Sequence, residues 1–371
     1  MKKLGFGMMR LPLKDANDMR SIDLEQLKQM VDLYMERGFT HFDTAYPYHL
    51  GASEVAFREA VAKRYDHSRY TVTDKMPCWE VKTEADLERI FNEQLERCGV
   101  EYFDYYWLHC LNYAYVATMN RVDGWGFIER KKAEGKIKHI GFSFHDESQL
   151  LEQLLKEHPE TEFVQLQINY LDWDSPTIES KTCYDLCVRY GKPVFAMEPV
   201  KGGSLAIVPA EAEALFREHD KEASAASWAV RYCASLPNVV NVLSGMSDMA
   251  QVEDNTRYME DFQPLSEQEH RIVEQAADII KGAIAIPCTA CHYCTDGCPQ
   301  NIAIPEYFNL YNTIKQFGRE QQSLNTSTYY GVLSANHGKA SDCIECGQCE
   351  EHCPQHIRIV DSLKLVAETF E

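Results

Sequence analysis

The sequence lacks any long apolar run, and no segment approaches the roughly 20 consecutive apolar residues that a membrane-spanning helix needs. The N-terminus also lacks the apolar stretch of a secretion signal, so we expect a cytoplasmic protein. Basic residues are few: 37 lysines and arginines stand against 57 aspartates and glutamates, for a formal charge of −20. Because nucleic acids and anionic membranes bind basic surfaces, we expect neither as a partner.

The length of 371 residues exceeds that of one ordinary domain, and 45% hydrophobic residues are enough for a sizeable core. The 14 cysteines are unevenly distributed, because eight of them follow residue 287. Without an export signal we do not interpret them as disulfides. We therefore expect a first domain over residues 1–262, a helical linker over 263–287 and a cysteine-rich domain over 288–371.

Short apolar runs alternate with amphipathic segments over the first domain, which predicts strands alternating with helices. The expected strands are 4–7, 38–42, 70–75, 103–108, 137–142, 163–167, 193–197 and 239–243. The expected helices include 23–37, 53–64, 83–98, 123–134, 146–157 and 176–190. Eight such strands favour an α/β fold of the (β/α)8 TIM-barrel type. The alternative, a doubly wound open sheet, would need a glycine-rich fingerprint after its first strand, and the sequence has none there.

Titratable residues fall at or just beyond the ends of three expected strands: Asp43 with Tyr48, then Lys75, then His109. The strands of a parallel barrel end on one face, and catalytic groups converge there. The alternative is structural, with Asp43 and Lys75 as an ion pair and the two rings as core residues.

The motifs "FDTAYPY..GASE", "VTDK" and "YYWLH" carry these residues, and together they resemble the catalytic tetrad of the aldo/keto reductases. The resemblance extends over about residues 1 to 260. It implies that Tyr48 donates a proton to a substrate carbonyl and that Lys75 lowers the pKa of Tyr48. It also implies that Asp43 pairs with Lys75 and that His109 orients the carbonyl oxygen.

The same resemblance implies a bound NAD(H) or NADP(H). The residues that would contact it are Ser143, Gln167, Met197, Gly245, Ser247, Asp248, Gln251, Asp254 and Asn255. Phe144 replaces the family's asparagine, Met197 replaces its stacking tyrosine, and Asp248 replaces a basic residue that meets the 2′-phosphate. Core packing would also explain Gln167 and Met197, and Asp248 would suit a helix cap. Because a carboxylate repels a phosphate, we expect NADH to bind more tightly than NADPH.

The C-terminal cysteines form the pattern C-x2-C-x2-C-x3-C-P twice, separated by 44 residues between Cys298 and Cys343. This pattern resembles bacterial two-cluster ferredoxins, so we expect a small, mainly helical, ferredoxin-like domain with two [4Fe–4S] clusters. The resemblance implies that each cluster takes three cysteines from one motif and the fourth from the other. One set would be Cys288, Cys291, Cys294 and Cys353, and the other Cys343, Cys346, Cys349 and Cys298. The alternative is structural zinc, whose cysteines usually come in pairs.

The combined pattern predicts a nicotinamide-dependent oxidoreductase that acts on a small carbonyl or alcohol substrate. Nicotinamide exchanges two electrons as hydride whereas each cluster passes one, and the sequence has no recognisable flavin site to connect them. The clusters would then be structural or would serve a one-electron donor or acceptor protein. The alternative function is an iron–sulfur electron-transfer protein whose barrel is a docking scaffold.

Overall fold

The computed structural model describes residues 2–15, 18–175, 178–290, 292–295, 297–317, 327 and 329–371. The chain divides into two compact units, and each is considered by itself. The first consists of Met1–Ile207 and Glu222–Arg271, and the second of Val208–Lys221 and Ile272–Glu371. No helix in the described ranges is long and apolar enough to cross a membrane.

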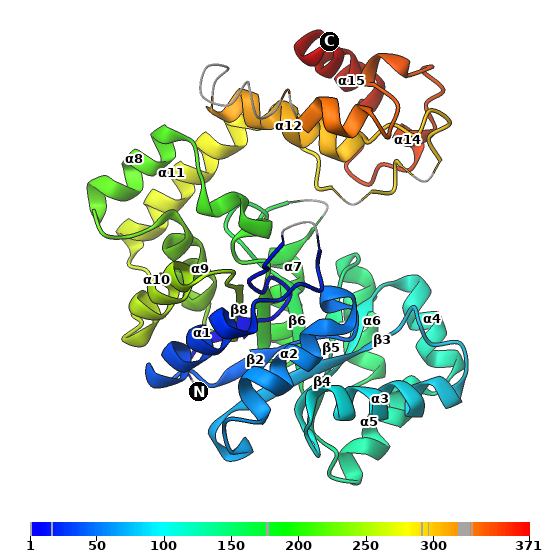
Figure 1. Cartoon of the computed structure of the whole chain (residues 1–371), viewed down its shortest axis with the longest axis vertical. Helices are drawn as coiled ribbons and strands as arrows, with labels where there is room; N and C mark the ends of the chain where they lie inside the picture. Colours follow the sequence, from blue (N-terminus) through cyan, green and yellow to red (C-terminus); the bar gives the residue numbers. More distant parts are fainter. Residues whose placement is uncertain are drawn as a thin grey trace. The chain divides into compact units, whose positions relative to one another are not determined.

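The first unit is a closed barrel of eight parallel strands in sequence order, completed by pairing of β1 with β8 (Figure 1). The strands are β1 Leu4–Gly7, β2 His41–Asp43, β3 Thr71–Pro77, β4 Phe103–Leu111, β5 Ile137–Phe144, β6 Phe163–Gln167, β7 Val194–Met197 and β8 Val239–Gly245. The predicted (β/α)8 barrel is therefore confirmed.

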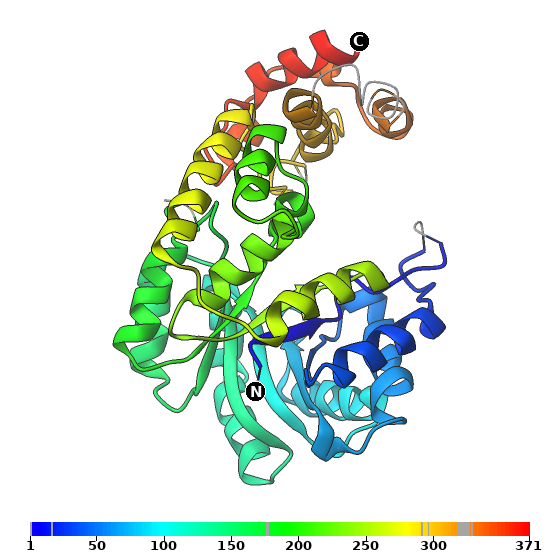
Figure 2. The ribbon, with the colours of Figure 1, turned by 90° about the vertical axis from the view of Figure 1, so that its left-hand side faces the viewer.

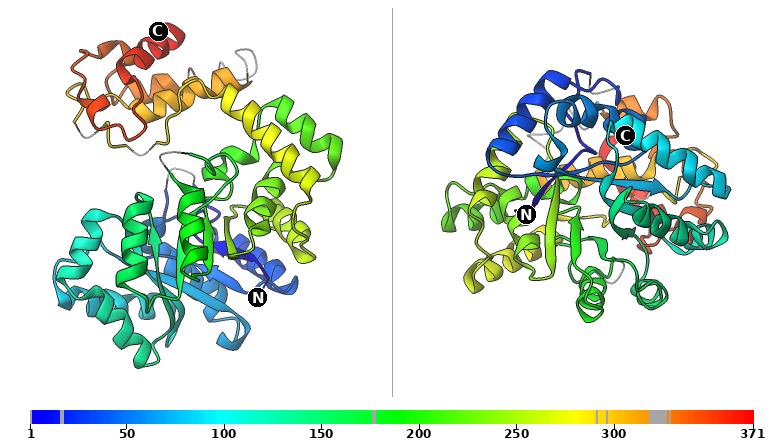
Figure 3. Two further views of the ribbon diagram at one scale, coloured as in Figure 1. Left: turned by 180° about the vertical axis from the view of Figure 1, so that it is seen from behind. Right: turned by 90° about the horizontal axis from the view of Figure 1, so that it is seen from below.

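Helices cover the outside of this barrel. They are α1 Leu24–Glu36, α2 Ala52–Phe57, α3 Glu84–Cys98, α4 Tyr113–Arg121, α5 Gly124–Ala133, α6 Ser148–Glu157, α7 Ser180–Arg189, α9 Ala225–Ser235 and α10 Met249–Glu260. Several consecutive helices pack side by side, as α6 and α7 do in Figure 3. Helix α1 packs on α10 where β1 and β8 close the barrel, which can be followed in Figure 2.

Local signals set several of the predicted boundaries. Asp23 caps α1 by accepting a hydrogen bond from the backbone N–H of Gln26 at 3.2 Å. Thr83 and Asp86 form a capping box at the start of α3, and Gly99 ends that helix with φ at 67°. The expected helix 53–64 is α2 continued by a π-helical segment, η2 Arg58–Ala62.

Helix α4 was not predicted from the sequence. Its residues are mostly aromatic, β-branched or otherwise poor helix formers, so the pattern is weak. Asn112 starts the helix by accepting a hydrogen bond from the Tyr115 N–H at 2.9 Å. The expected helix 176–190 begins at Ser180 in the structure, and its first two positions lie outside the described residues.

Aromatic side chains fill the barrel interior. Trp107, Phe195 and Leu243 form a buried cluster, with Tyr105 and Phe163 packed against it. Gly141 makes room for the indole, because a Cβ at that position would lie 2.4 Å from the Trp107 ring. The interior is therefore a packed core, and the site must lie at an end of the barrel.

The second unit is mainly helical. It contains α8 Ala210–His219, α12 Ile304–Phe317, α14 Gln348–Glu351, α15 Ile359–Phe370, a helical segment at 329–334 and most of α11 Glu267–Ala283. Helix α12 packs on α15, and both contribute to a buried cluster through Tyr307, Phe308, Leu363 and Val366. Apolar residues at helical spacing in the sequence predict a helix over 305–317, and α12 lies there, whereas α15 was not predicted.

Candidate functional site

Three neighbouring strands bring the predicted catalytic residues to one end of the barrel. Asp43 is the last residue of β2, Lys75 lies near the end of β3, and His109 lies near the end of β4. In the strand pairing, Asp43 is opposite Thr73 and Lys75 is opposite Trp107. Lys75 therefore lies two positions beyond the residue that pairs with Asp43, and His109 lies two positions beyond the residue that pairs with Lys75. All three side chains are buried.

Lys75 and Asp43 form an ion pair inside the barrel end. Lys75 Nζ lies 2.6 Å from Oδ1 of Asp43 and 2.7 Å from the carbonyl oxygen of Thr44. Burial lowers the pKa of Lys75 and is the largest single effect, but the charge and hydrogen bond of Asp43 together with the other neighbouring groups outweigh it, so the net shift is upward. Lys75 therefore stays an ammonium ion across the ordinary pH range.

Tyr48 follows β2 on a strained turn. It begins the 3-10 segment η1 Tyr48–Gly51, in which His49 and Leu50 have φ values of 52° and 53° and Gly51 has 86°. The buried His49 ring anchors this turn: Nε2 accepts the Leu11 N–H at 3.1 Å, and Nδ1 lies 2.8 Å from the Met19 carbonyl oxygen. Left-handed non-glycine residues cost free energy and persist where the surroundings enforce them. Sequence reasoning missed His49, although it directly follows Tyr48.

The Tyr48 ring lies close to both Lys75 and His109. Lys75 Nζ lies 5.0 Å from the centre of the Tyr48 ring, and the His109 ring lies 6.1 Å from it at an interplanar angle of 78°. Burial raises the pKa of Tyr48, and the charge and hydrogen bonding of Lys75 oppose this rise without cancelling it. Tyr48 is therefore a protonated phenol at neutral pH, which is the state a proton donor requires.

His109 is a neutral imidazole. Burial, followed by the charge of Lys75, lowers its pKa well below the usual range. Within the described ranges its Nδ1 has no hydrogen-bond partner. Trp79 packs 5.1 Å from the His109 ring and 6.0 Å from the Tyr115 ring, which gives this end of the barrel an aromatic wall. Neither Trp79 nor Tyr115 was identified from the sequence, because Trp79 is a single aromatic in a turn and Tyr115 lies in α4, which was not predicted.

Three of the residues expected to contact the nicotinamide lie at or near the ends of β5, β6 and β7. Ser143 is buried on β5, and its Oγ accepts the Cys110 N–H at 2.7 Å, which leaves the Ser143 hydroxyl hydrogen to donate elsewhere. Gln167 ends β6 and donates to Asp172 at 3.2 Å. Met197 ends β7. The strand ends therefore bring these three expected residues to the tetrad end of the barrel.

The expected adenine-end residues lie between β8 and α10. Gly245 ends β8, and Ser247 Oγ donates to the Arg10 carbonyl oxygen at 3.0 Å. Asp248 is the N-cap of α10 and accepts the Gln251 N–H at 2.9 Å. The capping role that the sequence left as an alternative for Asp248 is thus present in the structure.

The last two expected cofactor residues have partners within the barrel. Asp254 accepts hydrogen bonds from Ser224 and from Arg257, at 2.5 and 2.7 Å. The buried Asn255 side chain donates to Ser244 at 2.7 Å and accepts from the Tyr258 hydroxyl at 2.6 Å. Asp254 and Asn255 therefore tie the middle of α10 to Ser224 and to Ser244 on β8 in this structure.

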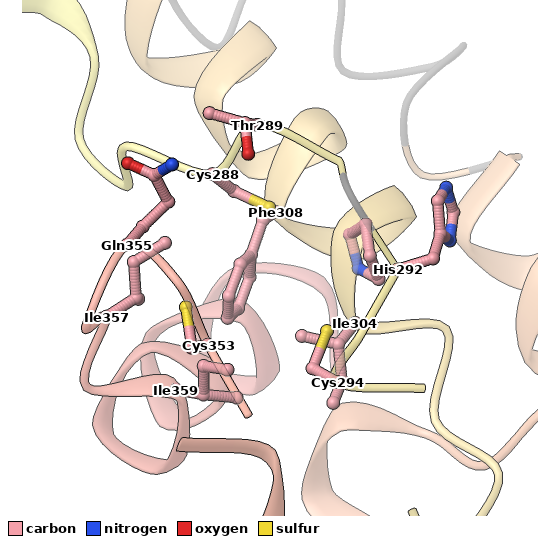
Figure 4. Close-up of a pocket in the computed structure, with 11 residues that line it drawn as sticks. Cys288, Thr289, His292, Cys294, Ile304, Phe308, Cys353, Gln355, Ile357 and Ile359 are labelled. Carbon is pink, nitrogen blue, oxygen red and sulfur yellow. The ribbon is translucent and has the colours of Figure 1, made fainter. Parts of the chain in front are cut away.

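The cysteine motifs of the second unit line two separate hollows. Cys288, Cys294 and Cys353 line the first, together with Ile304, Phe308 and His292 (Figure 4). The second hollow is lined by Cys298, Cys343, Cys346 and Cys349. Cys291 lies outside the described residues. Each hollow thus takes a cysteine from the other motif: Cys353 in the first and Cys298 in the second.

The two hollows fit a sulfur-ligated cluster. Thiols are their main ligand-type groups, and isoleucine and phenylalanine side chains supply much of the remaining wall. Backbone N–H groups also point at sulfur, from Ala290 to Cys288 at 3.4 Å and from Ile302 to Cys298 at 3.5 Å. Such hydrogen bonds stabilise thiolates and tune the reduction potential of iron–sulfur clusters.

Comparison with known families gives two matches. The model of the aldo/keto reductase family matches residues 3–278, and that of the 4Fe–4S dicluster domain matches residues 287–357. No curated protein matches the chain significantly.

Solved structures share the barrel. The aldo-keto reductase AKR11C1 from Bacillus halodurans, in its holo form, is 21% identical over 74% of this chain and 91% of its own, with a TM-score of 0.57. An aldo/keto reductase from Klebsiella pneumoniae in complex with NADP and acetate is 20% identical over 74% of this chain and 90% of its own, with a TM-score of 0.59. At such identities the likeness shows the fold alone.

Proposed function

The chain belongs to the aldo/keto reductase family and carries a 4Fe–4S dicluster domain, and on this premise we propose that it reduces a small carbonyl compound, or oxidises the alcohol, with Tyr48 as the proton donor. The observation that carries the proposal is the arrangement of Asp43, Tyr48, Lys75 and His109 at one barrel end, with a buried ammonium beside a protonated phenol.

Each tetrad residue has a distinct role in this proposal. Tyr48 gives its hydroxyl proton to the developing alkoxide oxygen of the substrate. Lys75 stabilises the phenolate that Tyr48 becomes, since a nearby positive charge favours the charged form. Asp43 holds the Lys75 ammonium in place, and the neutral His109 orients the carbonyl oxygen by hydrogen bonding.

A nicotinamide, when bound, would supply the hydride. Ser143, Gln167 and Met197 would hold its ring end, because they lie at or next to the last residues of neighbouring strands at the tetrad. The residues that would hold its adenine end are Gly245, Ser247, Asp248, Gln251, Asp254 and Asn255. We propose NADH as the tighter ligand, because Asp248 puts a carboxylate where a 2′-phosphate would need a cation. Two Klebsiella pneumoniae structures with a similar fold were crystallised with NADP and with NADPH.

We further propose two [4Fe–4S] clusters with crossed ligation. Cys288, Cys291, Cys294 and Cys353 would hold one, and Cys343, Cys346, Cys349 and Cys298 the other. The division of the seven described cysteines between two hollows supports this grouping. Each cluster, when present, would pass single electrons, so the partner would be a one-electron donor or acceptor protein.

A second candidate function is electron transfer with the barrel as a docking scaffold. The observation that favours it concerns Asp248, Asp254 and Asn255, which are expected at the adenine end. Their side chains already form hydrogen bonds with other residues of the barrel unit. The loss of the family's asparagine and stacking tyrosine, replaced by Phe144 and Met197, points the same way.

Anaerobic titration with NADH and NADPH separates the two functions. The full chain with its clusters is titrated while nicotinamide fluorescence and cluster absorbance are recorded, with and without a panel of aldehydes and ketones. Saturable binding and carbonyl-dependent oxidation of the nicotinamide are expected. Absence of binding for both nucleotides would reject the reductase and leave the electron-transfer protein.

A further inference from the structure

A second group of buried titratable side chains lies behind the tetrad, on the outer side of β3. Glu54 on α2, Asp74 on β3 and Cys98 on α3 place their ligand-type atoms within 4.8 Å of one another. All three side chains are fully buried. Asp74 directly precedes Lys75, and successive residues of a strand point to opposite faces, so Asp74 faces the helices while Lys75 faces the barrel end. The mechanism proposed above uses none of these three residues.

Nearly all carboxylate oxygens of this group have hydrogen-bond donors. Asp74 Oδ1 accepts the backbone N–H of Lys75 at 2.8 Å and Nε2 of Gln94 at 2.9 Å. Asp74 Oδ2 accepts the Cys98 thiol at 3.5 Å. Glu54 Oε2 accepts from Arg97 at 3.1 Å. The exception is Glu54 Oε1, which is buried and has no partner in the described part of the chain.

An unpartnered carboxylate oxygen beside a second buried carboxylate is costly, and a proton removes the cost. Two carboxylates in one buried site cannot both ionise, so one keeps its proton and donates it to the other. We propose that Glu54 and Asp74 share one proton, carried mainly by Glu54, and that this acid–carboxylate pair positions Lys75 from behind.

The charges facing the pair are consistent with one retained proton. Lys75 on β3 and Arg97 on α3 are the cations, and Asp43 on β2 and Asp74 are the anions. With Glu54 neutral these charges balance, whereas an ionised Glu54 would leave an excess negative charge in a buried place.

The other titratable groups packed against the pair are neutral. Burial, reinforced by the acids, raises the pKa of the Cys98 thiol and of the Tyr106 hydroxyl on β4. Burial raises the pKa of Glu54 and Asp74 as well, and their mutual repulsion adds to the rise for Glu54. Arg97 also meets Glu93 on its partly exposed side, at 3.4 Å.

The pair acts on the tetrad in two ways, and this half of the inference rests on the proposed function. Asp74 accepts a hydrogen bond from the backbone N–H of Lys75, which fixes the part of β3 from which the Lys75 side chain extends. The pKa of Tyr48 is raised first by burial, is lowered by Lys75, and is raised again by the charges of Asp43 and Asp74. Because the proton makes Glu54 neutral, Glu54 adds no further negative charge near Tyr48.

The shared proton is tested by infrared spectroscopy, without any assay of activity. The full chain at neutral pH is expected to show the C=O stretching band of a protonated, buried carboxylic acid. Glu54→Gln, which keeps the size and the hydrogen-bonding capacity, should lose this band. Glu96→Gln, an exposed site on α3, is the matched control and should keep it. An identical band in Glu54→Gln and wild type, or no band in either, would overturn the shared proton.

The positioning role is tested by the pH profile of kcat/KM for carbonyl reduction. The double variant Glu54→Gln/Asp74→Asn removes the pair's charge, so the alkaline limb should move to lower pH by about half a unit. Glu54→Gln alone should leave that limb in place, because it replaces one neutral group with another. If the double variant is folded by circular dichroism and its limb does not move, the positioning role is wrong. If wild type reduces no carbonyl, the proposed function fails while the infrared result still decides the proton.

Discussion

Lys75 Nζ lies 2.6 Å from Oδ1 of Asp43, and both side chains are closed off from solvent. The ammonium also lies beneath the Tyr48 ring, so the same positive charge that neutralises Asp43 reaches the phenol. A buried cation depends strongly on the buried anion that pairs with it. The ion pair at the tetrad end of the barrel should therefore matter both for stability and for the proposed reaction.

Replacing the proposed donor should remove activity and leave the fold intact. Tyr48→Phe deletes only the hydroxyl, so carbonyl reduction should fall by at least ~10²-fold, the usual scale for a general acid. Tyr46→Phe, two residues earlier and hydrogen-bonded to Glu93, is the control and should keep most activity. Turnover of Tyr48→Phe equal to wild type, with any reducible aldehyde or ketone, would reject Tyr48 as donor.

Breaking the buried ion pair should destabilise the protein strongly. Asp43→Asn leaves the buried Lys75 ammonium without its charge partner, so the free energy of unfolding of the barrel should fall by about 3–5 kcal/mol. Asp32→Asn breaks the partly exposed pair with Arg64 and should cost no more than about 1 kcal/mol. Denaturant unfolding of both variants measures the difference, and equal losses would contradict the buried pair.

Stability should fall as the solution becomes acidic, partly because of buried neutral histidines. Burial lowers the pKa of His41 to about 3 and that of His109 well below its usual range. Below about pH 6.5 the unfolded chain binds protons on these rings that the folded chain excludes, so stability is lost as pH falls through that value.

The test is the slope of unfolding free energy against pH between about 6.5 and 4.5. The slope is proportional to the number of protons that the unfolded chain binds in excess of the folded chain. His109→Gln should lower this number by up to one relative to wild type, because it removes a ring that stays unprotonated in the folded chain. The exposed His219→Gln on α8 should leave the slope nearly unchanged. A steeper slope in His109→Gln would show that His109 binds a proton in the folded state.

Cluster ligation is expected to cross between the two motifs. Anaerobically prepared protein should contain close to eight irons, which follows from two clusters of four. Cys298→Ser should damage the cluster otherwise held by Cys343, Cys346 and Cys349, as seen by iron content and paramagnetic resonance. Cys183→Ser, a buried cysteine on α7, is the control and should keep both clusters. Damage confined to the cluster of Cys288 and Cys294 would show that ligation does not cross.

Nicotinamide preference should depend on the charge at Asp248. Asp248→Asn keeps a side chain that can cap α10 and removes the carboxylate. Asp248→Arg adds a cation but loses the helix cap, which contributes about 1 kcal/mol to stability. NADPH should bind more tightly to both variants than to wild type, and most tightly to Asp248→Arg. Glu260→Arg, at the far end of α10, should have little effect. Tighter binding of NADPH than NADH by wild type would contradict the prediction.

The eight-stranded barrel and its family were predictable from sequence because both rest on local patterns. Apolar runs of strand length, separated by amphipathic segments, allow few other arrangements, and the cysteine spacing encodes a cluster loop within a few residues. Two of the elements that were missed, α4 and α15, show the limit of this approach. Helix α4 has a weak local preference, starts at the Asn112 cap and buries Val116 and Met119, and α15 is stabilised by packing its apolar face against the second unit's core.

The sequence by itself determined which residues we propose to carry the chemistry: Asp43, Tyr48, Lys75, His109 and the two cysteine motifs stand in recognisable surroundings. Only the tertiary structure decided what surrounds them. It placed His49 in a left-handed turn behind Tyr48, packed Trp79 on His109, and buried Glu54 against Asp74. These relationships join residues on separate elements, and the burial that shifts their pKa values exists only when the barrel has closed. Local spacing therefore predicts the reactive groups, whereas their protonation states depend on charge and solvent exclusion across the whole fold.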